Sequence, residues 1–259
     1  MRIAIIGAGA MGGALAEGLL KGNIFLPKDV TIANPHEDKL KRFAEIGASI
    51  TTENQAAIIG ADIVVIAVKP QTVRQVLEDI KPSFDPEGQV LVNMAANIGS
   101  TQIQQWLEND HLTIFQVIPN TAIAQRCSMT FIAPIGATAE QTAMMEQIFD
   151  DLGKTYITDE AHLEAGTVLA SCGIAYAMRY IRAAAEGGVE LGFSADVAKD
   201  IVLQTVKGAV ALLQASGNHP EAEIDKVTTA GGTTIKGLNE MEHAGFTSAV
   251  IRGLKAASE

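Results

Sequence analysis

The stretch Arg2-Ile3-Ala4-Ile5-Ile6-Gly7-Ala8-Gly9-Ala10-Met11-Gly12 decides the fold of the N-terminal part of this 259-residue chain. Its apolar start predicts a buried strand, and residues 11–21 have the composition of a helix. The glycines between them have the spacing Gly-x-Gly-x-x-Gly, which in a strand–turn–helix context is typical of dinucleotide binding. The first permits a tight turn, the second lets a pyrophosphate approach the backbone, and the third allows close helix–strand packing. We therefore expect phosphate contacts from Gly7, Ala8, Gly9, Ala10, Met11 and Gly12.

The same alternation of apolar runs and amphipathic segments continues to about residue 157. Continuous apolar strands separated by helices are typical of a parallel sheet covered on both faces, which predicts an α/β, doubly wound, Rossmann-type domain. The expected strands lie at 2–6, 30–33, 49–50, 63–68, 89–92 and 113–117, with edge strands at 129–133 and 155–157. The expected helices lie at 11–21, 37–46, 54–59, 70–80 and 139–152.

The pattern changes after residue 157. No proline occurs between His162 and Ser216, and apolar residues recur at helical spacing, which predicts two or three long helices. Ser194 is expected to cap one of them after Gly192. Small residues crowd these helices, which suits either a dimer core or ordinary packing within one subunit. We expect two domains, residues 1–157 and an all-helical domain of residues 158–259.

The end of the second strand bears on cofactor choice, because a carboxylate there would favour NAD. Asn34 stands at that point, and His36 and Lys39 follow it. This favours NADPH, with NADH still possible because Glu37 and Asp38 are nearby. Asn34 also suits a plain turn.

Loops after the later strands lie at the sheet edge where ligands bind in open α/β sheets. Lys69 either faces the cofactor or extends over the surface. Together these loops are expected to surround a nicotinamide, with contacts from Ala67, Val68, Lys69, Pro70, Ala95, Ala96, Asn97, Pro119 and Asn120.

A second glycine turn follows in Val227-Thr228-Thr229-Ala230-Gly231-Gly232-Thr233-Thr234-Ile235. A glycine turn before a helix presents backbone N–H groups to an anion, and threonine hydroxyls add donors. A small carboxylate would fit there, although a plain turn with a threonine cap explains the residues equally simply.

Composition excludes several classes of protein. The net charge of −11 argues against non-specific binding to nucleic acid or to an anionic membrane. The two cysteines match no zinc spacing, and the histidines are scattered, so no metal site is expected. No apolar run is long enough to cross a bilayer and no signal peptide fits, so we expect a cytoplasmic protein.

These residues resemble the pyrroline-5-carboxylate reductase family along essentially the whole chain. The resemblance is carried by GAGAMG at 7–12, AVKP at 67–70, MAA at 94–96, PNT at 119–121 and, most specifically, VTTAGGTTIKGL at 227–238. It implies hydride transfer from NAD(P)H to a cyclic imine to give L-proline. It also implies that the helical domain binds substrate and forms a homodimer, with a larger assembly of dimers allowed.

The resemblance also implies residue roles. The substrate carboxylate meets the turn Gly231, Gly232, Thr233 and Thr234, and the Thr234 hydroxyl lies near the ring nitrogen as the catalytic group. Glu160 and Thr167 match positions near the substrate, and Asn54 matches an adenosine contact.

The chain departs from the family pattern at several positions. Gln116 stands where arginine is frequent, Asn97 where glycine is typical, and Ile174 where proline is usual. Thr229 and Ala230 replace a Ser-Pro pair, Ala122 replaces a proline, and the loop 124–128 differs. These changes bear on substrate size and catalytic efficiency rather than on the fold.

Two alternatives remain open on the sequence. A related reductase of another imine or hydroxy acid would need a catalytic lysine on the first long helix of the second domain, and no lysine lies between Lys154 and Lys199. A non-catalytic NAD(P)-binding module is disfavoured by the intact second glycine turn.

Overall fold

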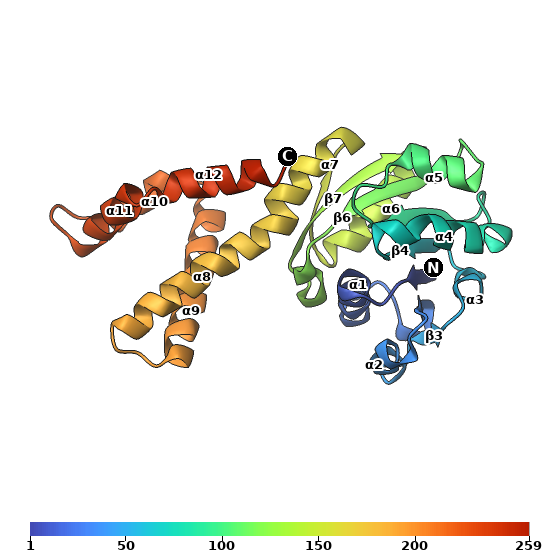
Figure 1. Ribbon diagram of the computed structural model, residues 1–259, viewed down its shortest axis with the longest axis horizontal. Helices are drawn as coiled ribbons and strands as arrows, with labels where there is room; N and C mark the ends of the chain where they lie inside the picture. The colour runs from blue at the N-terminus through green and yellow to red at the C-terminus, as the bar shows by residue number, and fades with distance from the viewer. Residues whose placement is uncertain (259) are drawn as a thin grey trace. The chain divides into compact units, whose positions relative to one another are not determined.

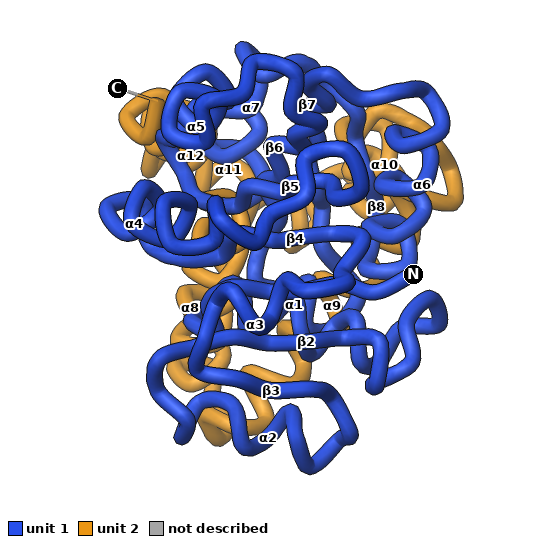
Figure 2. The backbone as a smooth tube through the Cα atoms, turned by 90° about the vertical axis from the view of Figure 1, so that its right-hand side faces the viewer, with its two compact units in different colours: residues 1–171 blue, residues 172–259 orange. Residues whose placement is uncertain are grey.

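The computed structural model describes residues 1–258, and residue 259 lies outside the described part. The chain forms two compact units, residues 1–171 and residues 172–259 (Figure 2). Residues 158–171 thus pack with the first unit, and the domain boundary expected after residue 157 stays a prediction.

The first unit is built on one eight-stranded sheet with the order β3-β2-β1-β4-β5-β6-β7-β8. Its strands are β1 Ile3–Ile6, β2 Val30–Ala33, β3 Ser49–Thr51, β4 Ile63–Ile66, β5 Val90–Asn93, β6 Ile114–Ile118, β7 Ser128–Ile135 and β8 Gly153–Ile157. The first six are parallel, β7 runs antiparallel to β6, and β8 is parallel to β7. The expected doubly wound parallel sheet with added edge strands is confirmed.

Helices cover both faces of this sheet (Figure 1). Alternate residues of β1 point to opposite faces, so Ile3 and Ile5 pack into one apolar core while Ala4 and Ile6 pack into the other. The first core is closed by α1 Ala10–Lys21, α2 Lys41–Ala44 and α6 Ala139–Asp150. The second is closed by α3 Asn54–Ile58, α4 Pro70–Ile80 and α5 Ser100–Leu107.

The single helix expected at 37–46 is confirmed only in part, because the structure divides it into two short helical turns. The structure has a single 3-10 turn at Glu37–Lys39 followed by α2, which is one turn long. Phe43 is fully buried and Leu40 nearly so, whereas most of the segment is charged and exposed. Two apolar anchors fix the segment against the core, and they are too few to extend a helix.

The first unit ends in α7 Leu163–Gly166 and a π-helical segment, Thr167–Cys172, whose last residue opens the second unit. The second unit contains only helices among its described residues: α8 Gly173–Glu190, α9 Ala195–Ser216, α10 Pro220–Lys226, α11 Thr233–His243 and α12 Phe246–Ala256. Ser194 occupies the N-cap of α9 as expected, but its side chain makes no capping hydrogen bond there. Small residues allow close packing, since a Cβ on Gly188 would lie 2.9 Å from the Cβ of Ala198.

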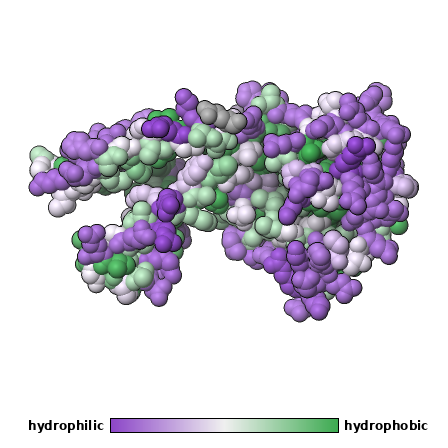
Figure 3. Space-filling model, in the orientation of Figure 1, coloured by the Kyte–Doolittle hydropathy of each residue, from purple (hydrophilic) through white to green (hydrophobic). Residues whose placement is uncertain are grey.

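The helices of the second unit leave many apolar side chains uncovered, which Figure 3 shows as green surface. Among the described residues of this unit, Ala198 is the only fully buried apolar one. Exposed ones on α8 and α9 include Met178, Val189, Ile201, Leu203, Val210 and Leu212. Within residues 1–258, no helix is both long enough and apolar enough to cross a membrane.

Candidate functional site

The three glycines of the β1–α1 turn have three different steric environments. Gly7 has a φ of +107°, and a Cβ there would lie 2.5 Å from the carbonyl oxygen of Ala67. A Cβ on Gly12 would overlap the carbonyl oxygen of Gly7 itself, because α1 begins against the end of β1. A Cβ on Gly9 would meet nothing within 4 Å, so of the three glycines this is the one at which the backbone is open to a ligand. The turn therefore has the geometry expected of a dinucleotide phosphate loop.

The backbone N–H groups of this turn also suit a phosphate site. The first hydrogen bond within α1 runs from the Gly13 N–H to the Gly9 carbonyl, at 2.8 Å. The N–H groups of Ala10, Met11 and Gly12 precede that bond and lack partners within the helix. Aligned peptide dipoles add partial positive charge here, so the residues fit the phosphates of a dinucleotide without a basic side chain.

Asn34 holds the glycine turn in place. Its Oδ1 accepts from the Ala8 N–H at 3.2 Å, and its Nδ2 donates to the His36 carbonyl at 3.2 Å. The side chain is buried. These contacts stabilise the turn, which is the simpler of the two roles expected of Asn34, and its contact with NADPH stays a prediction.

The loop after β4 packs directly on the glycine turn. Ala67 donates its N–H to the Ile6 carbonyl at 2.9 Å and supplies the carbonyl that crowds Gly7. Pro70 is the first residue of α4, where its missing N–H costs nothing. Lys69 is the N-cap of α4 and is exposed, and the cofactor contact expected of it stays a prediction.

The loop after β5, residues 94–99, is held by buried polar side chains. Asn93 Nδ2 donates to the carbonyls of Ala95 and Ile98, both at 3.2 Å, and its Oδ1 accepts from the Ala95 N–H at 3.2 Å. Gln116 Nε2 donates to the same Ile98 carbonyl at 2.9 Å. Asn97 adopts a left-handed conformation with a φ of +61°, where the family typically has glycine.

Glu160 reaches this loop from the segment before α7. Its carboxylate accepts from the Ser100 N–H at 2.7 Å, the Ser100 hydroxyl at 2.6 Å and Gln116 Nε2 at 3.1 Å. Neighbouring His162 is exposed and lies 2.6 Å from the carboxylate of Asp159. The hydrogen bond with His162 lowers the pKa of Asp159.

Asn120 connects the loop after β6 to the π-helical segment. Its Oδ1 accepts from the Ala122 N–H at 3.0 Å, and its Nδ2 donates to the Ala170 carbonyl at 3.4 Å. The Ser171 hydroxyl donates to the Pro119 carbonyl at 2.6 Å. π-Helical turns are frequent at functional sites, and this one lies against a loop that was expected to touch the cofactor.

Two other expected contacts have partners within the protein. Asn54 Nδ2 donates to Asp79 at 3.0 Å, and Thr167 Oγ1 donates to the Leu163 carbonyl at 2.8 Å. The roles expected of both residues stay predictions.

In the second unit, the second glycine turn precedes α11 as expected. Gly231 has a φ of +70°, which favours glycine, and the Gly232 N–H donates to the Thr229 carbonyl at 2.9 Å. Thr233 and Thr234 begin α11, and both are exposed.

On α10, hydrogen bonds from Lys226 and Asn218 lower the pKa of Glu223 to about 2, so this carboxyl is ionised at neutral pH and cannot donate a proton.

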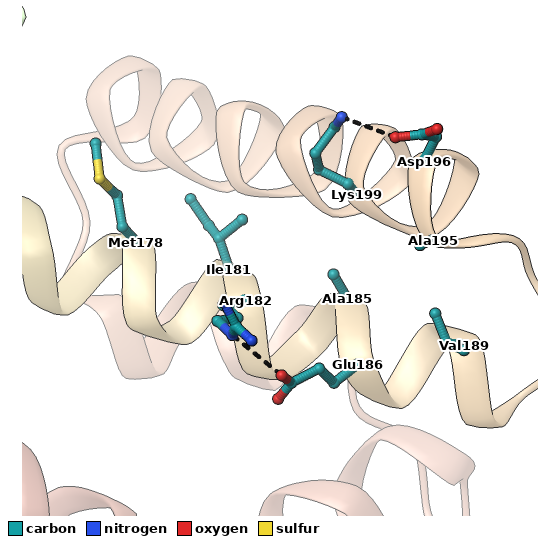
Figure 4. A pocket seen from close by; sticks show the side chains of 9 residues that line it. All are labelled: Met178, Ile181, Arg182, Ala185, Glu186, Val189, Ala195, Asp196 and Lys199. Carbon is teal, nitrogen blue, oxygen red and sulfur yellow. Dashed lines mark hydrogen bonds and ion pairs between the residues drawn. The ribbon is translucent and has the colours of Figure 1, made fainter.

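An open cavity of about 450 Å³ lies between α8 and α9, and none of the expected site residues lines it (Figure 4). Its charged groups pair within each helix: Arg182 with Glu186 at 3.1 Å, and Lys199 with Asp196 at 3.2 Å. The remaining lining is mostly apolar. Across residues 1–258 no group of side chains has the composition of a metal site.

Asn93 and Ser100 were not singled out in the sequence, and Gln116 was noted only as a departure. The sequence did contain a signal for two of them. Asn93 ends and Gln116 interrupts an otherwise apolar strand, and a polar side chain buried in this way needs a hydrogen-bond partner.

Comparison with known proteins agrees with this geometry. Residues 160–259 match the pyrroline-5-carboxylate reductase dimerisation family, and residues 2–97 match the family described as NADP oxidoreductase coenzyme F420-dependent. Pyrroline-5-carboxylate reductase 2 of Dictyostelium discoideum is 36% identical over 272 residues, covering 99% of this chain and 91% of its own. Pyrroline-5-carboxylate reductase 1 of the same organism is also 36% identical, and this chain spans 48% of that longer protein.

A solved structure supports the same assignment over both units. The Plasmodium falciparum pyrroline carboxylate reductase with NADP bound has a TM-score of 0.90 at 25% identity, covering 100% of this chain and 95% of that one. The chain therefore belongs to the pyrroline-5-carboxylate reductase family.

Proposed function

We propose that this protein reduces L-1-pyrroline-5-carboxylate to L-proline, the last step of proline biosynthesis, with NADPH as the preferred reductant. The observation that carries the proposal is the glycine turn, closed at Gly7 and Gly12 and open at Gly9, in a chain that matches the family along its whole length. When bound, NADPH would supply the hydride, which adds to the C=N carbon of the imine, the carbon that becomes C5 of proline; one proton is consumed at the nitrogen, and the products are proline and NADP⁺. NADH remains a second possible reductant.

The turn at 7–12 would hold the pyrophosphate, with Asn34 and Asn54 towards the adenosine. The loops 67–70, 95–97 and 119–120 would line the nicotinamide. NADPH as the reductant is supported by the NADP in the Plasmodium falciparum structure and by the NADP oxidoreductase match.

The substrate carboxylate would bind at the turn Gly231, Gly232, Thr233 and Thr234. The N–H groups at the start of α11 provide donors for an anion. The Thr234 hydroxyl would lie near the ring nitrogen and help keep the imine protonated, its oxygen accepting from the iminium N–H, and Glu160 and Thr167 would lie near the substrate. A protonated imine accepts hydride more readily, because its positive charge is neutralised in the transition state.

The helical region, residues 158–259, would form a homodimer, and a larger assembly of dimers is compatible with it. Uncovered apolar side chains on α8 and α9 and the dimerisation-family match support this. We place the enzyme in the cytoplasm, with a small-molecule substrate. We expect neither nucleic acid nor membrane as a partner, because the net charge of −11 disfavours binding to either.

The test is to mix the purified protein with pyrroline-5-carboxylate and NADPH or NADH, following absorbance at about 340 nm, the nicotinamide band, and proline formation. We expect proline in proportion to NADPH consumed. Tight NADPH binding without proline would contradict the proposal and favour the non-catalytic module.

Thr234 has its own test. Thr234→Val keeps the shape of the side chain and removes the hydroxyl, so kcat is expected to fall by about 10²-fold, within the usual range for one proton-transfer or hydrogen-bonding group. Thr234→Ser restores the hydroxyl and should recover most of the rate. A wild-type rate in Thr234→Val would remove this hydroxyl from the mechanism.

A further inference from the structure

Four residues from distant parts of the first unit form one connected set of hydrogen bonds: Asn93, Ser100, Gln116 and Glu160, here called the polar clamp. We propose that Glu160 is a positioning residue, which through this clamp fixes the loop 94–99 against the nicotinamide. The inference rests on the proposed function for the identity of the ligand, but the clamp itself can be tested without turnover.

The clamp is directed at the loop. Asn93 and Gln116 both hold the Ile98 carbonyl, and Asn93 also holds both backbone polar groups of Ala95. These contacts fix the loop at its beginning and near its end. Ala95, Ala96 and Asn97, the residues expected to touch the nicotinamide, lie between or beside these points.

Glu160 orients the rest of the clamp. One carboxylate oxygen accepts from the Ser100 N–H and from Gln116 Nε2, and the other accepts from the Ser100 hydroxyl. Gln116 Nε2 therefore donates to Glu160, which leaves its Oε1 to accept from Asn93 at 2.7 Å. Without the carboxylate, Gln116 Nε2 keeps only the Ile98 carbonyl as an acceptor, and the buried pair Asn93 and Gln116, 1% and 4% exposed, loses its hydrogen-bonded link to Ser100.

The carboxylate also lies at the N-terminus of α5, where negative charge is stabilised by the free N–H groups of the first turn. Gln116 is neutral, so in this chain no cation within the clamp balances Glu160. Hydrogen bonds to this one carboxylate thus join Gln116, which holds the Ile98 carbonyl, to the start of α5, where the loop ends, and such bonds to charged groups are stronger than neutral ones.

The experiment compares Glu160→Ala and the milder Glu160→Gln with Gln102→Ala. Gln102 is the matched control, because its side chain caps the same helix by accepting from the Gly99 N–H at 3.0 Å without contacting Glu160 or Gln116. Trp106, the only tryptophan in the chain, lies on α5 and reports on its packing through acrylamide quenching of fluorescence.

We expect Glu160→Ala to increase quenching of Trp106 in the free protein and to raise the dissociation constant for NADPH about tenfold, as for loss of one hydrogen bond to a charged group. Glu160→Gln should fall between it and the wild type. Gln102→Ala should lower the melting temperature while leaving NADPH affinity within about twofold, since exposed helix caps act on helix stability alone.

Two results would overturn the clamp. One is an increased KM for the imine in the Glu160 variants with unchanged NADPH affinity and Trp106 quenching, which would leave Glu160 its place near the substrate and remove the positioning role. The other is an equal loss of NADPH affinity in Gln102→Ala, which would reduce the effect to helix capping. Absence of proline formation by the wild type would contradict the proposed function, whereas quenching and NADPH binding would still decide the clamp.

Discussion

At the scale of single residues, Gly9 and Gly12 allow a sharp comparison, because the protein leaves space for a methyl group at one and none at the other. Gly9→Ala should fold with nearly wild-type stability but raise the NADPH dissociation constant at least about tenfold, because the new methyl group lies where the pyrophosphate approaches the backbone. Gly12→Ala should lower the free energy of unfolding by about 2–4 kcal/mol, because backbone must move to accommodate it.

Thermal unfolding and NADPH titration of both variants separate the two effects. Gly253→Ala, on α12, is a suitable control because a Cβ there meets nothing within 4 Å and the residue lies in the second unit, outside the helices α8 and α9. Equal losses of stability in Gly9→Ala and Gly12→Ala would contradict the division of roles between these glycines.

At the scale of elements, the sequence predicted features that depend on neighbouring residues better than features that depend on residues far apart in the chain. Strands such as β1 and β4 were predictable because burial on both faces leaves a continuous apolar run. The roles of Gly7 and Gly12 followed from local chain geometry. The polar clamp could not be predicted in the same way, because Asn93, Gln116 and Glu160 meet only once the sheet places their segments together.

Another contact between elements predicts a pH effect. Asp151, at the end of α6, accepts from the Asn23 backbone and side chain at 2.8 and 3.0 Å and pairs with Arg126 at 2.6 Å. Burial raises the pKa of this carboxyl, but the bonds from Asn23 and Arg126 outweigh it and lower the pKa overall. A lowered pKa in the folded state stabilises the protein above the usual aspartate pKa, and this contribution is lost as the pH falls through the lowered value.

Asp151→Asn should therefore melt at a lower temperature than the wild type at pH 7, and the gap should shrink as the pH falls below the usual aspartate pKa of about 3.9. Scanning calorimetry from neutral to acidic pH measures it. Glu146→Gln, at an exposed position on the same helix, serves as the control. A gap that stays constant with pH would show that packing rather than charge makes the contribution of Asp151.

At the scale of the whole molecule, the apolar surface of the second unit is the feature that one chain leaves unexplained. On α9, Ile201, Leu203, Val210 and Leu212 are 46%, 45%, 48% and 60% exposed. Their spacing puts Ile201 and Leu212 on one side of the helix and Leu203 and Val210 on the opposite side, and a helix that is apolar on both sides is normally buried. Apolar area of this kind marks an association surface, so a second copy of the chain is the expected cover.

Leu212→Asp should therefore shift the protein from dimer or larger assembly towards monomer, because a charge at a packed interface is left without a partner. Sedimentation velocity over a range of protein concentrations measures the shift, and Lys207→Gln, exposed on the same helix, should leave the assembly unchanged. Obligate dimers lose stability with dissociation, so the melting temperature of Leu212→Asp should also become dependent on protein concentration. A wild-type protein that sediments as a monomer at all concentrations would mean that these side chains stay in water, and the dimer proposed for this chain would be wrong.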